Sequence, residues 1–405
     1  MNKSRLAYLI SQYPAISHTF ILREIRMLRD FNFDISVASI NPPDRNVEEL
    51  TEAEREEATN TYYIKPDGIK GAIKAHFYTL FTQPFNYIGG LLFALRLGQF
   101  DLKKILYNLF YFVEAVMIGR WMQRNKLSHL HVHFGMAAAT VGLITKRIFP
   151  IKYSFTMHGP RDFYDIYGCY LSQKITDADF ICCITYFASS QLMMLSSPDC
   201  WNKLEVSPLG VDPNTFIPHQ FCREPEPFEI LCVGRLVPDK GQFILLEAVT
   251  YLIAKGYKLR LHLVGDGPDR LTLETKVKQR GLTEQVIFAG AVNQNQILKF
   301  YANTDIFVLA SFAEGLPVVL MEAMVMEIPC VTTNITGVPE LIEHGVNGLL
   351  VAPSDVNDLA QSIAKLMDEP DLRQQMGIAA SQKVKKHYEL QQNTKRLADI
   401  FRKRL

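Results

Sequence analysis

Short apolar runs alternate with amphipathic segments along most of the chain, and this alternation predicts its architecture. In each half, runs rich in β-branched residues are followed by segments whose apolar positions recur at helical spacing. Such alternation is typical of βαβ units, in which helices cover a parallel sheet. The predicted strands span residues 5–11, 34–40, 129–134, 153–158 and 179–185 in the first half, and 229–235, 259–265, 286–290, 305–311 and 329–333 in the second.

A proline-rich stretch separates the two halves and predicts a domain boundary. A chain of 405 residues is too long for one hydrophobic core, so two domains are expected. The prolines of the stretch prevent regular structure there. We expect an α/β fold with two Rossmann-like domains, arranged as residues 1–210, a linker at 211–226, a second domain at 227–385, and an amphipathic helix with a basic end at 386–405.

A long helical insertion interrupts the first half at about residues 68–126. It mixes many aromatic side chains with lysines and arginines, a composition typical of helices that lie on a membrane surface. Helices that cover the first sheet would account for the aromatic residues equally well. Both interpretations remain open at this point.

Composition excludes several classes of protein. The chain is 48% hydrophobic and 21% charged, and its net charge of +1 argues against a nucleic-acid partner. Its seven cysteines are scattered without a CxxC pair or zinc spacing, which indicates a reducing compartment. The N-terminal apolar run is too short for a signal peptide, and no run of about 18 uncharged apolar residues exists. We therefore expect a cytoplasmic protein without a membrane span, held at the inner face of the membrane if the insertion contacts it.

The segment EGLPVVLMEAMVME carries a carboxylate, Glu322, inside an otherwise apolar run. Pro317 suits the first position of a helix, which we expect to begin at Gly315 or Leu316 and to run through Met326. The first free amides of this helix, at residues 318–320, would form a phosphate site with the helix dipole. A buried carboxylate without partners costs several kcal/mol. Glu322 therefore needs a partner, either a protein cation or the hydroxyl groups of a ligand.

Polar and glycine-rich turns follow the strands of the second half. GRLVPDKG places Arg235 and Lys240 at the carboxyl end of a strand, where open parallel sheets bind ligands. VGDGP and ITGVPE end two further strands with turns. A pair of cations opposite a helix N-terminus suits a diphosphate. Each glycine-rich turn alone is a weak indication of a ligand site, but turns at successive strand ends in one domain are a stronger one.

With these motifs in order, and with the E-x₇-E spacing of EGLPVVLME, the chain resembles the retaining GT-B glycosyltransferases of family 4, also called group 1. The pieces SQYPAISHTFILREI, HVHFG and FTMHGPRDFYD are similar to the exopolysaccharide branch of the colanic-acid type. The resemblance implies two domains facing across a cleft and a last helix that crosses back to the first domain. It also implies transfer of a hexose from a UDP- or GDP-linked sugar to a growing, lipid-linked surface glycan, with retention and without a metal or cofactor.

The resemblance assigns roles to residues. Glu322 would bind the ribose hydroxyls and Glu314 the sugar hydroxyls, while Arg235 and Lys240 would neutralise the diphosphate. His158 would stand near the reacting sugar. The predicted site comprises the catalytic residues His158 and Glu314, the donor-binding residues Arg235, Lys240, Gly265, Gly267, Glu314, Gly315, Leu316, Val318, Val319 and Glu322, and the acceptor-side residues Ser17, His18, Thr19 and His133.

Two N-terminal patterns carry further expectations. The run HLHVHF sets three histidines on one face of a strand, but no carboxylate or cysteine ligand stands nearby, so we expect His133 to line the cleft without a metal. Many family members have a glycine-rich turn after the first strand, where this chain has QYPAISHTF. We expect Ser17 and Thr19 to cap the following helix there.

Two other functions fit parts of the pattern. A nucleotide-sugar epimerase on the same fold would bind the donor without an acceptor, and a non-catalytic subunit would bind the nucleotide-sugar alone. The E-x₇-E spacing with Arg235 and Lys240 favours the transferase over both. A Rossmann dehydrogenase is disfavoured, because no G-x-G-x-x-G follows the first strand.

Overall fold

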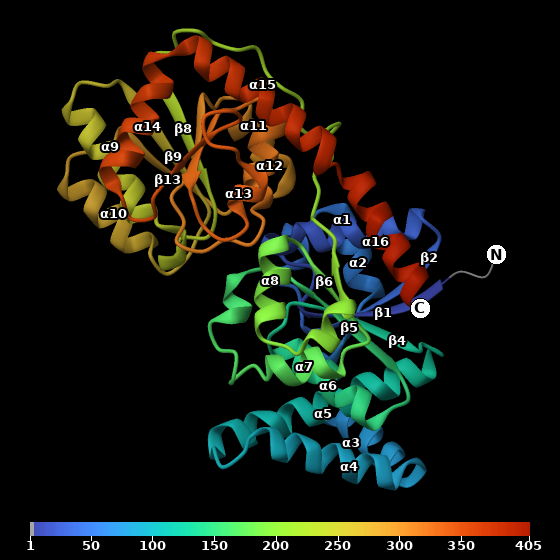
Figure 1. Ribbon diagram of the computed structural model, residues 1–405. Coiled ribbons are helices and arrows are strands. Elements are labelled where there is room, and N and C mark those ends of the chain that lie inside the picture. Colours follow the sequence, from blue (N-terminus) through green and yellow to red (C-terminus); the bar gives the residue numbers. More distant parts are fainter. Residues whose placement is uncertain (1–3) are drawn as a thin grey trace. The chain divides into compact units, whose positions relative to one another are not determined.

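The computed structural model describes residues 4–405 and divides into two compact units (Figure 1). Unit 1 contains the described residues up to Ser207 together with Thr394–Leu405, and unit 2 is Pro208–Asn393. The sequence had suggested boundaries at residues 210 and 386. The first three residues of the N-terminal segment lie outside the described residues.

Unit 1 contains a sheet of seven parallel strands in the order β3-β2-β1-β4-β5-β6-β7. The chain moves outward from β1 through β2 and β3 and then returns to the other side of β1 with β4. The loops after β1 and β4 therefore meet at the point where the strand order reverses, the usual ligand site of such sheets. The strands are β1 Ser4–Gln12, β2 Phe33–Asn41, β3 Tyr62–Tyr63, β4 His129–His133, β5 Lys152–Met157, β6 Phe180–Cys183 and β7 Leu204–Val206.

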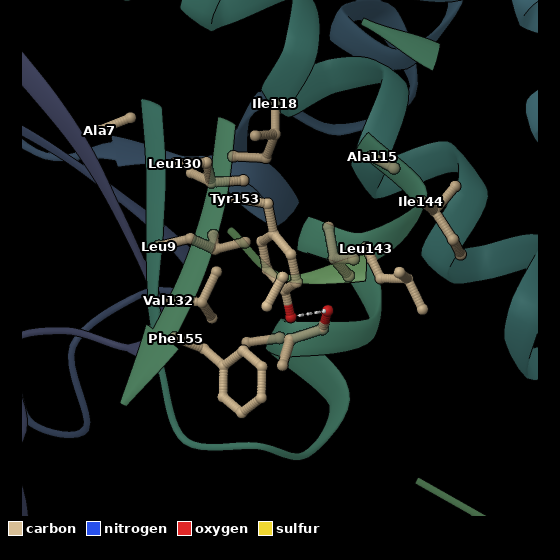
Figure 2. Packing of buried hydrophobic residues seen from close by; sticks show 14 of the residues in the cluster. Ala7, Leu9, Ala115, Ile118, Leu130, Val132, Leu143, Ile144, Tyr153 and Phe155 are labelled. Atoms are coloured by element: carbon tan, nitrogen blue, oxygen red, sulfur yellow. Dashed lines mark hydrogen bonds between the residues drawn. The ribbon is translucent and has the colours of Figure 1, made fainter. Parts of the chain in front are cut away.

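The two faces of this sheet have separate cores, set by the alternation of side chains along each strand. On β1, Leu6 and Tyr8 belong to one core and Ala7 and Leu9 to the other. Figure 2 shows the second core, where the ring of Tyr153 lies among aliphatic side chains and its hydroxyl donates a hydrogen bond of 2.8 Å to a main-chain carbonyl. The first core also contains the end of the last helix, through Leu397, Ala398, Ile400 and Phe401.

Helices cover both faces of the unit 1 sheet. Helix α6 lies against the strands, and α5 packs on α6. Figure 1 shows α3, α4 and α5 as a helical layer at one end of the unit. The helices are α1 Thr19–Asp30, α2 Glu52–Asn60, α3 Ile64–Thr82, α4 Pro84–Leu97, α5 Leu102–Arg124, α6 Ala137–Ile148, α7 Leu171–Asp177 and α8 Tyr186–Met194.

Unit 2 contains a sheet of six parallel strands in the order β10-β9-β8-β11-β12-β13. The strand order reverses between β8 and β11, so the loops that follow these two strands meet there. The strands are β8 Phe228–Val233, β9 Leu259–Val264, β10 Val286–Gly290, β11 Ile306–Leu309, β12 Cys330–Thr333 and β13 Leu349–Val351.

The helices of unit 2 bury aliphatic side chains against its sheet. The last helix, α16, begins in unit 2, and its residues from 394 onward belong to unit 1. The helices are α9 Gln242–Ala254, α10 Arg270–Gln279, α11 Gln294–Tyr301, α12 Val318–Val325, α13 Val338–Leu341, α14 Val356–Asp368, α15 Pro370–His387 and α16 Leu390–Arg404.

The ten predicted strands are all present, and the α/β class with two parallel-sheet units is confirmed. Strands β3, β7 and β13 were not predicted. They have only two or three residues each, too few to show a periodic pattern.

Helices α3, α4 and α5 occupy the predicted insertion, and they match both interpretations of it in part. The later part of α5 is buried, including Phe112 and Val116 in the core beside α6. By contrast, Phe81, Phe85 and Phe100 expose 76%, 89% and 103% of their surface. None of the described helices is both long enough and apolar enough to span a bilayer.

Candidate active site

The loops after β8 and β11 bring two predicted residues together in unit 2. The Nζ of Lys240 lies 2.5 Å from Oε1 of Glu314, and the hydroxyl of Ser311 donates to the same oxygen at 2.7 Å. Glu314 is only 7% exposed. The ion pair therefore stands where the strand order reverses, the position expected for a ligand site in a parallel sheet.

Arg235 lies in the same loop as Lys240 and is exposed. Within residues 4–405 its guanidinium has no ion-pair partner. The main-chain carbonyl of Arg235 accepts a hydrogen bond of 2.8 Å from the side chain of Gln242, the first residue of α9. The loop is thus held to the helix while its charged group faces solvent, which leaves that group available to an anion.

The glycines of VGDGP pack the loop after β9 against the loop after β8. Gly265 has a φ of +142°, and a Cβ there would lie 2.0 Å from the carbonyl oxygen of Gly234. A Cβ at Gly267 would lie 2.3 Å from the carbonyl oxygen of Leu236. The amide of Leu236 donates to the carbonyl of Asp266 at 2.9 Å. Both predicted glycines therefore allow the loop after β9 to pack closely against the loop after β8, which carries Arg235.

Helix α12 begins later than predicted. Pro317 was expected at its first position, but Pro317 has a ψ of 110° and precedes the helix, which starts at Val318 and ends one residue short of Met326. The carbonyl of Pro317 accepts from the amides of Leu320 and Met321, as an N-cap carbonyl does. Gly315 and Leu316 thus belong to the preceding turn. The half-buried Val318 and Val319 form the first turn, whose amides have no acceptor within a helix.

Glu322 has a protein partner that neither predicted alternative described. Its carboxylate is 5% exposed and accepts a hydrogen bond of 3.1 Å from the hydroxyl of Tyr301, the last residue of α11. The same hydroxyl lies 3.1 Å from the carbonyl oxygen of Val319. A neutral hydroxyl group thus reduces the cost of burying this carboxylate and ties α11 to the first turn of α12.

In unit 1, the predicted residues Ser17, His18 and Thr19 follow β1 at the reversal of strand order. The expectation that Ser17 and Thr19 cap the next helix is wrong. Residues Ile16–His18 form a turn of 3₁₀ helix, so His18 directly precedes α1, and no side chain caps it. The imidazole of His18 instead contacts Phe134 in the loop after β4, with ring centroids 4.9 Å apart.

The other predicted histidines of unit 1 meet beside this point. Nδ1 of His133, the last residue of β4, lies 2.8 Å from Nε2 of His158, which follows β5. Burial and the neighbouring His133 and His18 hold the pKa of His158 well below its usual value, so its ring is neutral near pH 7. His131 is buried with both ring nitrogens bonded to the hydroxyls of Ser154 and Thr156. Among the described residues no three histidine, cysteine or acidic side chains are placed to hold a metal.

A buried lysine supports the loop after β4. Nζ of Lys174 donates to the carbonyls of Gly135 and Met136 at 2.7 and 2.8 Å. Burial lowers the pKa of Lys174 to about 7 and raises the pKa of the neighbouring Asp162 to about 6. Asp162 in turn accepts the amide of Gly135 at 3.2 Å. The two side chains thus fix the turn that follows His133.

The structure therefore forms two groups of predicted residues, one in each unit. In unit 2 Lys240 pairs with Glu314 just before α12, and Arg235 lies in the same loop as Lys240. In unit 1 His18, His133 and His158 lie near one another. Sequence reasoning missed the side chains that hold these groups in place. They are Tyr301, Ser311 and Thr336, whose hydroxyl donates to the carbonyl of Glu314, in unit 2, and Glu24, Asp162 and Lys174 in unit 1.

The residues of the unit 2 group lie in a part of the chain that is similar to a known protein family. Residues 215–383, which include the whole group of unit 2, match the family model of glycosyl transferases group 1. Residues 215–383 thus form a domain of the group 1 glycosyltransferases. WcaL of Escherichia coli (strain K12), whose name assigns it to colanic acid biosynthesis, is 26% identical to this glycosyltransferase over 89% of the chain and 90% of its own length. The amylovoran biosynthesis glycosyltransferase AmsK of Erwinia amylovora is 25% identical over 98% of the chain and 99% of its own length.

Solved structures give the same fold to this glycosyltransferase. Sucrose-phosphate synthase of Thermosynechococcus elongatus matches with a TM-score of 0.76 at 15% identity, over 99% of both chains. HepE of Anabaena, solved in complex with UDP, matches with a TM-score of 0.71 at 16% identity, over 99% of this chain and all of its own. The two parallel-sheet units thus form the GT-B fold.

Proposed function

We propose that this glycosyltransferase transfers a hexose from a UDP- or GDP-linked sugar to a growing, lipid-linked glycan of a bacterial exopolysaccharide. The transfer retains the configuration of the sugar and needs no divalent metal. The observation that carries the proposal is the Lys240–Glu314 pair at the strand reversal of unit 2, beside the start of α12.

Each part of the donor has a partner in this group. Arg235, Lys240 and the amides of the first turn of α12 supply positive charge for a diphosphate, the role that a metal ion fills elsewhere. Glu314 lies within reach of a sugar held by that diphosphate and accepts hydrogen bonds from its hydroxyl groups. Glu322 accepts from the ribose, and Tyr301 holds its carboxylate in place. In unit 1, His158 orients the reacting hydroxyl group.

The names of the relatives support the choice of substrates. WcaL and AmsK are named for exopolysaccharide biosynthesis. HepE was crystallised with UDP-glucose, and a mannosyltransferase 29% identical over 49% of this chain is named as GDP-mannose-dependent. Both nucleotides therefore belong in the test.

Calorimetric titration of the full chain with UDP, GDP, ADP and their hexose conjugates, in the presence of a chelator, tests the donor site. We expect one nucleotide to bind. We expect Glu322→Ala and Lys240→Met to weaken this binding about 10- to 100-fold, because each removes a charged hydrogen-bond partner. Lys258→Met, which removes an exposed lysine of the same unit, is the matched control. Folded protein that binds none of the ligands would contradict the proposal.

Release of free nucleotide together with a glycosylated acceptor separates the transferase from its rivals. An epimerase would convert the donor sugar without releasing nucleotide, and a non-catalytic subunit would bind the donor unchanged. The anomeric configuration of the product, read by NMR against that of the donor, tests retention.

We also propose that the helical layer α3 to α5 contacts an anionic membrane surface. Half of the exposed large apolar side chains among the described residues lie between residues 69 and 110. Residues 64–124 carry eight lysines and arginines against three acidic residues, in a chain whose net charge is only +1. Exposed aromatic groups with a basic excess are typical of surfaces that insert among anionic headgroups. Such contact would bring the enzyme to a lipid-linked acceptor.

Sedimentation with lipid vesicles tests this contact. We expect binding to vesicles that contain phosphatidylglycerol and weaker binding to pure phosphatidylcholine. Combined replacement of Phe81, Phe85 and Phe100 by serine should lower binding at least about tenfold, since each exposed ring loses its insertion into the bilayer. Replacement of the exposed Tyr164 and Tyr167, outside this layer, should leave binding unchanged. Equal binding of the triple variant would refute the assignment of this surface.

A further inference from the structure

Four buried polar side chains lie next to one another in unit 1. The hydroxyl of Tyr8 on β1 donates to Oε1 of Glu24 on α1 at 2.9 Å. The same oxygen lies 3.3 Å from Nε2 of His133, a contact outside hydrogen-bond geometry, and the other ring nitrogen of His133 is 2.8 Å from Nε2 of His158. The two rings are stacked, with centroids 5.0 Å apart. None of the four residues is more than 8% exposed.

The chemistry of these four side chains determines which nitrogens carry protons. Burial and the Glu24 carboxylate raise the pKa of Tyr8 well above its usual value, so Tyr8 keeps its proton and donates. Nε2 of His133 lies 3.3 Å from the same carboxylate oxygen, close enough for the negative charge to favour a proton on this nitrogen. The proton of a neutral His133 ring therefore belongs on Nε2, which leaves Nδ1 as an acceptor.

The proton on His133 also determines which nitrogen of His158 carries a proton. Because Nδ1 of His133 accepts, Nε2 of His158 must carry the proton shared between the two rings. The ring of His158 is neutral near pH 7, so its Nδ1 is a bare acceptor. That nitrogen is buried and has no hydrogen-bond partner among the described residues. His131 on the same strand differs, because both of its nitrogens are bonded.

We propose that Glu24 is a positioning residue that sets the ring protons of His133 and His158, so that Nδ1 of His158 accepts a hydrogen bond from a substrate hydroxyl group. This inference rests on the function proposed above, because it gives His158 a direction for the reaction assigned to it. Without the carboxylate, His133 is free to carry its proton on Nδ1. His158 would then accept that proton with Nε2 and present an N–H to the substrate.

The ring protons are observed directly in long-range ¹H–¹⁵N spectra of the full chain labelled at histidine. We expect the wild-type spectrum to show His158 protonated at Nε2 and bare at Nδ1. Glu24→Leu should change this pattern, and Tyr8→Phe, which keeps the carboxylate, should not. A wild-type His158 that carries its proton on Nδ1 would overturn the inference, whatever the activity of the enzyme.

Turnover provides the second readout. We expect Glu24→Leu to lower kcat about 100-fold, because the reacting hydroxyl group loses the acceptor that orients it, with the donor KM changed less than about threefold. Glu24→Gln keeps an oxygen acceptor for His133 and should restore kcat to within about tenfold of wild type. Folded Glu24→Leu protein with wild-type kcat would refute the role, since a merely structural residue changes stability and not turnover.

The two readouts separate this inference from the proposed function. If wild-type protein transfers no sugar from any donor, the proposed function fails, and the spectrum still decides the proton order. If the Glu24→Leu chain does not fold, the wild-type spectrum together with kcat of Glu24→Gln decides it.

Discussion

Replacement of Lys240 by methionine tests the central ion pair of unit 2. Glu314 is 7% exposed and the Lys240 side chain 20% exposed, so the change leaves a carboxylate buried without its cation. Methionine has a similar length and shape, which limits the effect on packing. The remaining side-chain donor to Glu314 is the hydroxyl of Ser311.

The expected magnitude follows from this burial. Removal of one partner of a buried pair costs about 3–5 kcal/mol, because the other charge stays desolvated. For a unit of this size each kcal/mol lowers Tm by about 2–4 °C, so the Lys240→Met protein should melt about 6–20 °C below wild type. Combination with Glu314→Gln removes the buried charge and keeps an acceptor for Ser311. We expect the double variant to recover most of the loss, to within about 2 kcal/mol of wild type.

Calorimetry of the single and double variants measures the coupling between the two residues. The reasoning predicts that the double variant is more stable than the Lys240→Met single variant, although it carries one change more. If the two changes add, so that the double variant is the least stable of the set, Lys240 and Glu314 do not stabilise each other. Both single variants should also lose donor binding, which separates the stability effect from the binding effect.

Two further predictions concern stability. Gly265→Ala should lower Tm more than Gly256→Ala. Both glycines have a positive φ, but only at Gly265 would a Cβ meet the carbonyl oxygen of Gly234, which costs about 1–3 kcal/mol beyond the backbone strain. Equal melting temperatures of the two variants would contradict this. Burial lowers the pKa of Lys174 to about 7, so the unfolded chain binds more protons between pH 7 and pH 10, and wild type should gain stability over Lys174→Met as pH rises through that window. Urea unfolding at several pH values checks this, and parallel pH profiles for the two proteins would refute it.

The sequence predicted the strands well because each carries a continuous apolar run. Parallel strands buried on both faces have no polar positions to interrupt the run, and turn residues mark their ends. The edge strands β3, β7 and β13 are too short for this signal. The start of α12 was misplaced because proline at the first helical position and proline just before it have the same φ.

The partners of the site residues could not be predicted, because they come from distant parts of the chain. Tyr301 reaches Glu322 from the end of α11 and, in the sequence, has the appearance of an ordinary core aromatic residue. Glu24 did carry a signal. It lies three residues after Ile21 and four before Leu28, both buried, so helical spacing sets its carboxylate on the apolar stripe of α1. Such a carboxylate in a helix needs an explanation for the same reason as Glu322.

The assignment of residues 394–405 to unit 1 has a consequence for how the protein is made. Leu397 and Phe401 complete a core that is otherwise built from the first part of the chain. Unit 2 is continuous, so it can fold on the ribosome as soon as it emerges. Unit 1 must wait, with one face of its sheet covered only in part, while the intervening residues 208–393 are synthesised, roughly 10–40 s at ordinary rates of translation. During that interval Tyr8 and its apolar neighbours lack the cover of the last helix, and chaperones that bind exposed apolar segments should be found on the nascent chain.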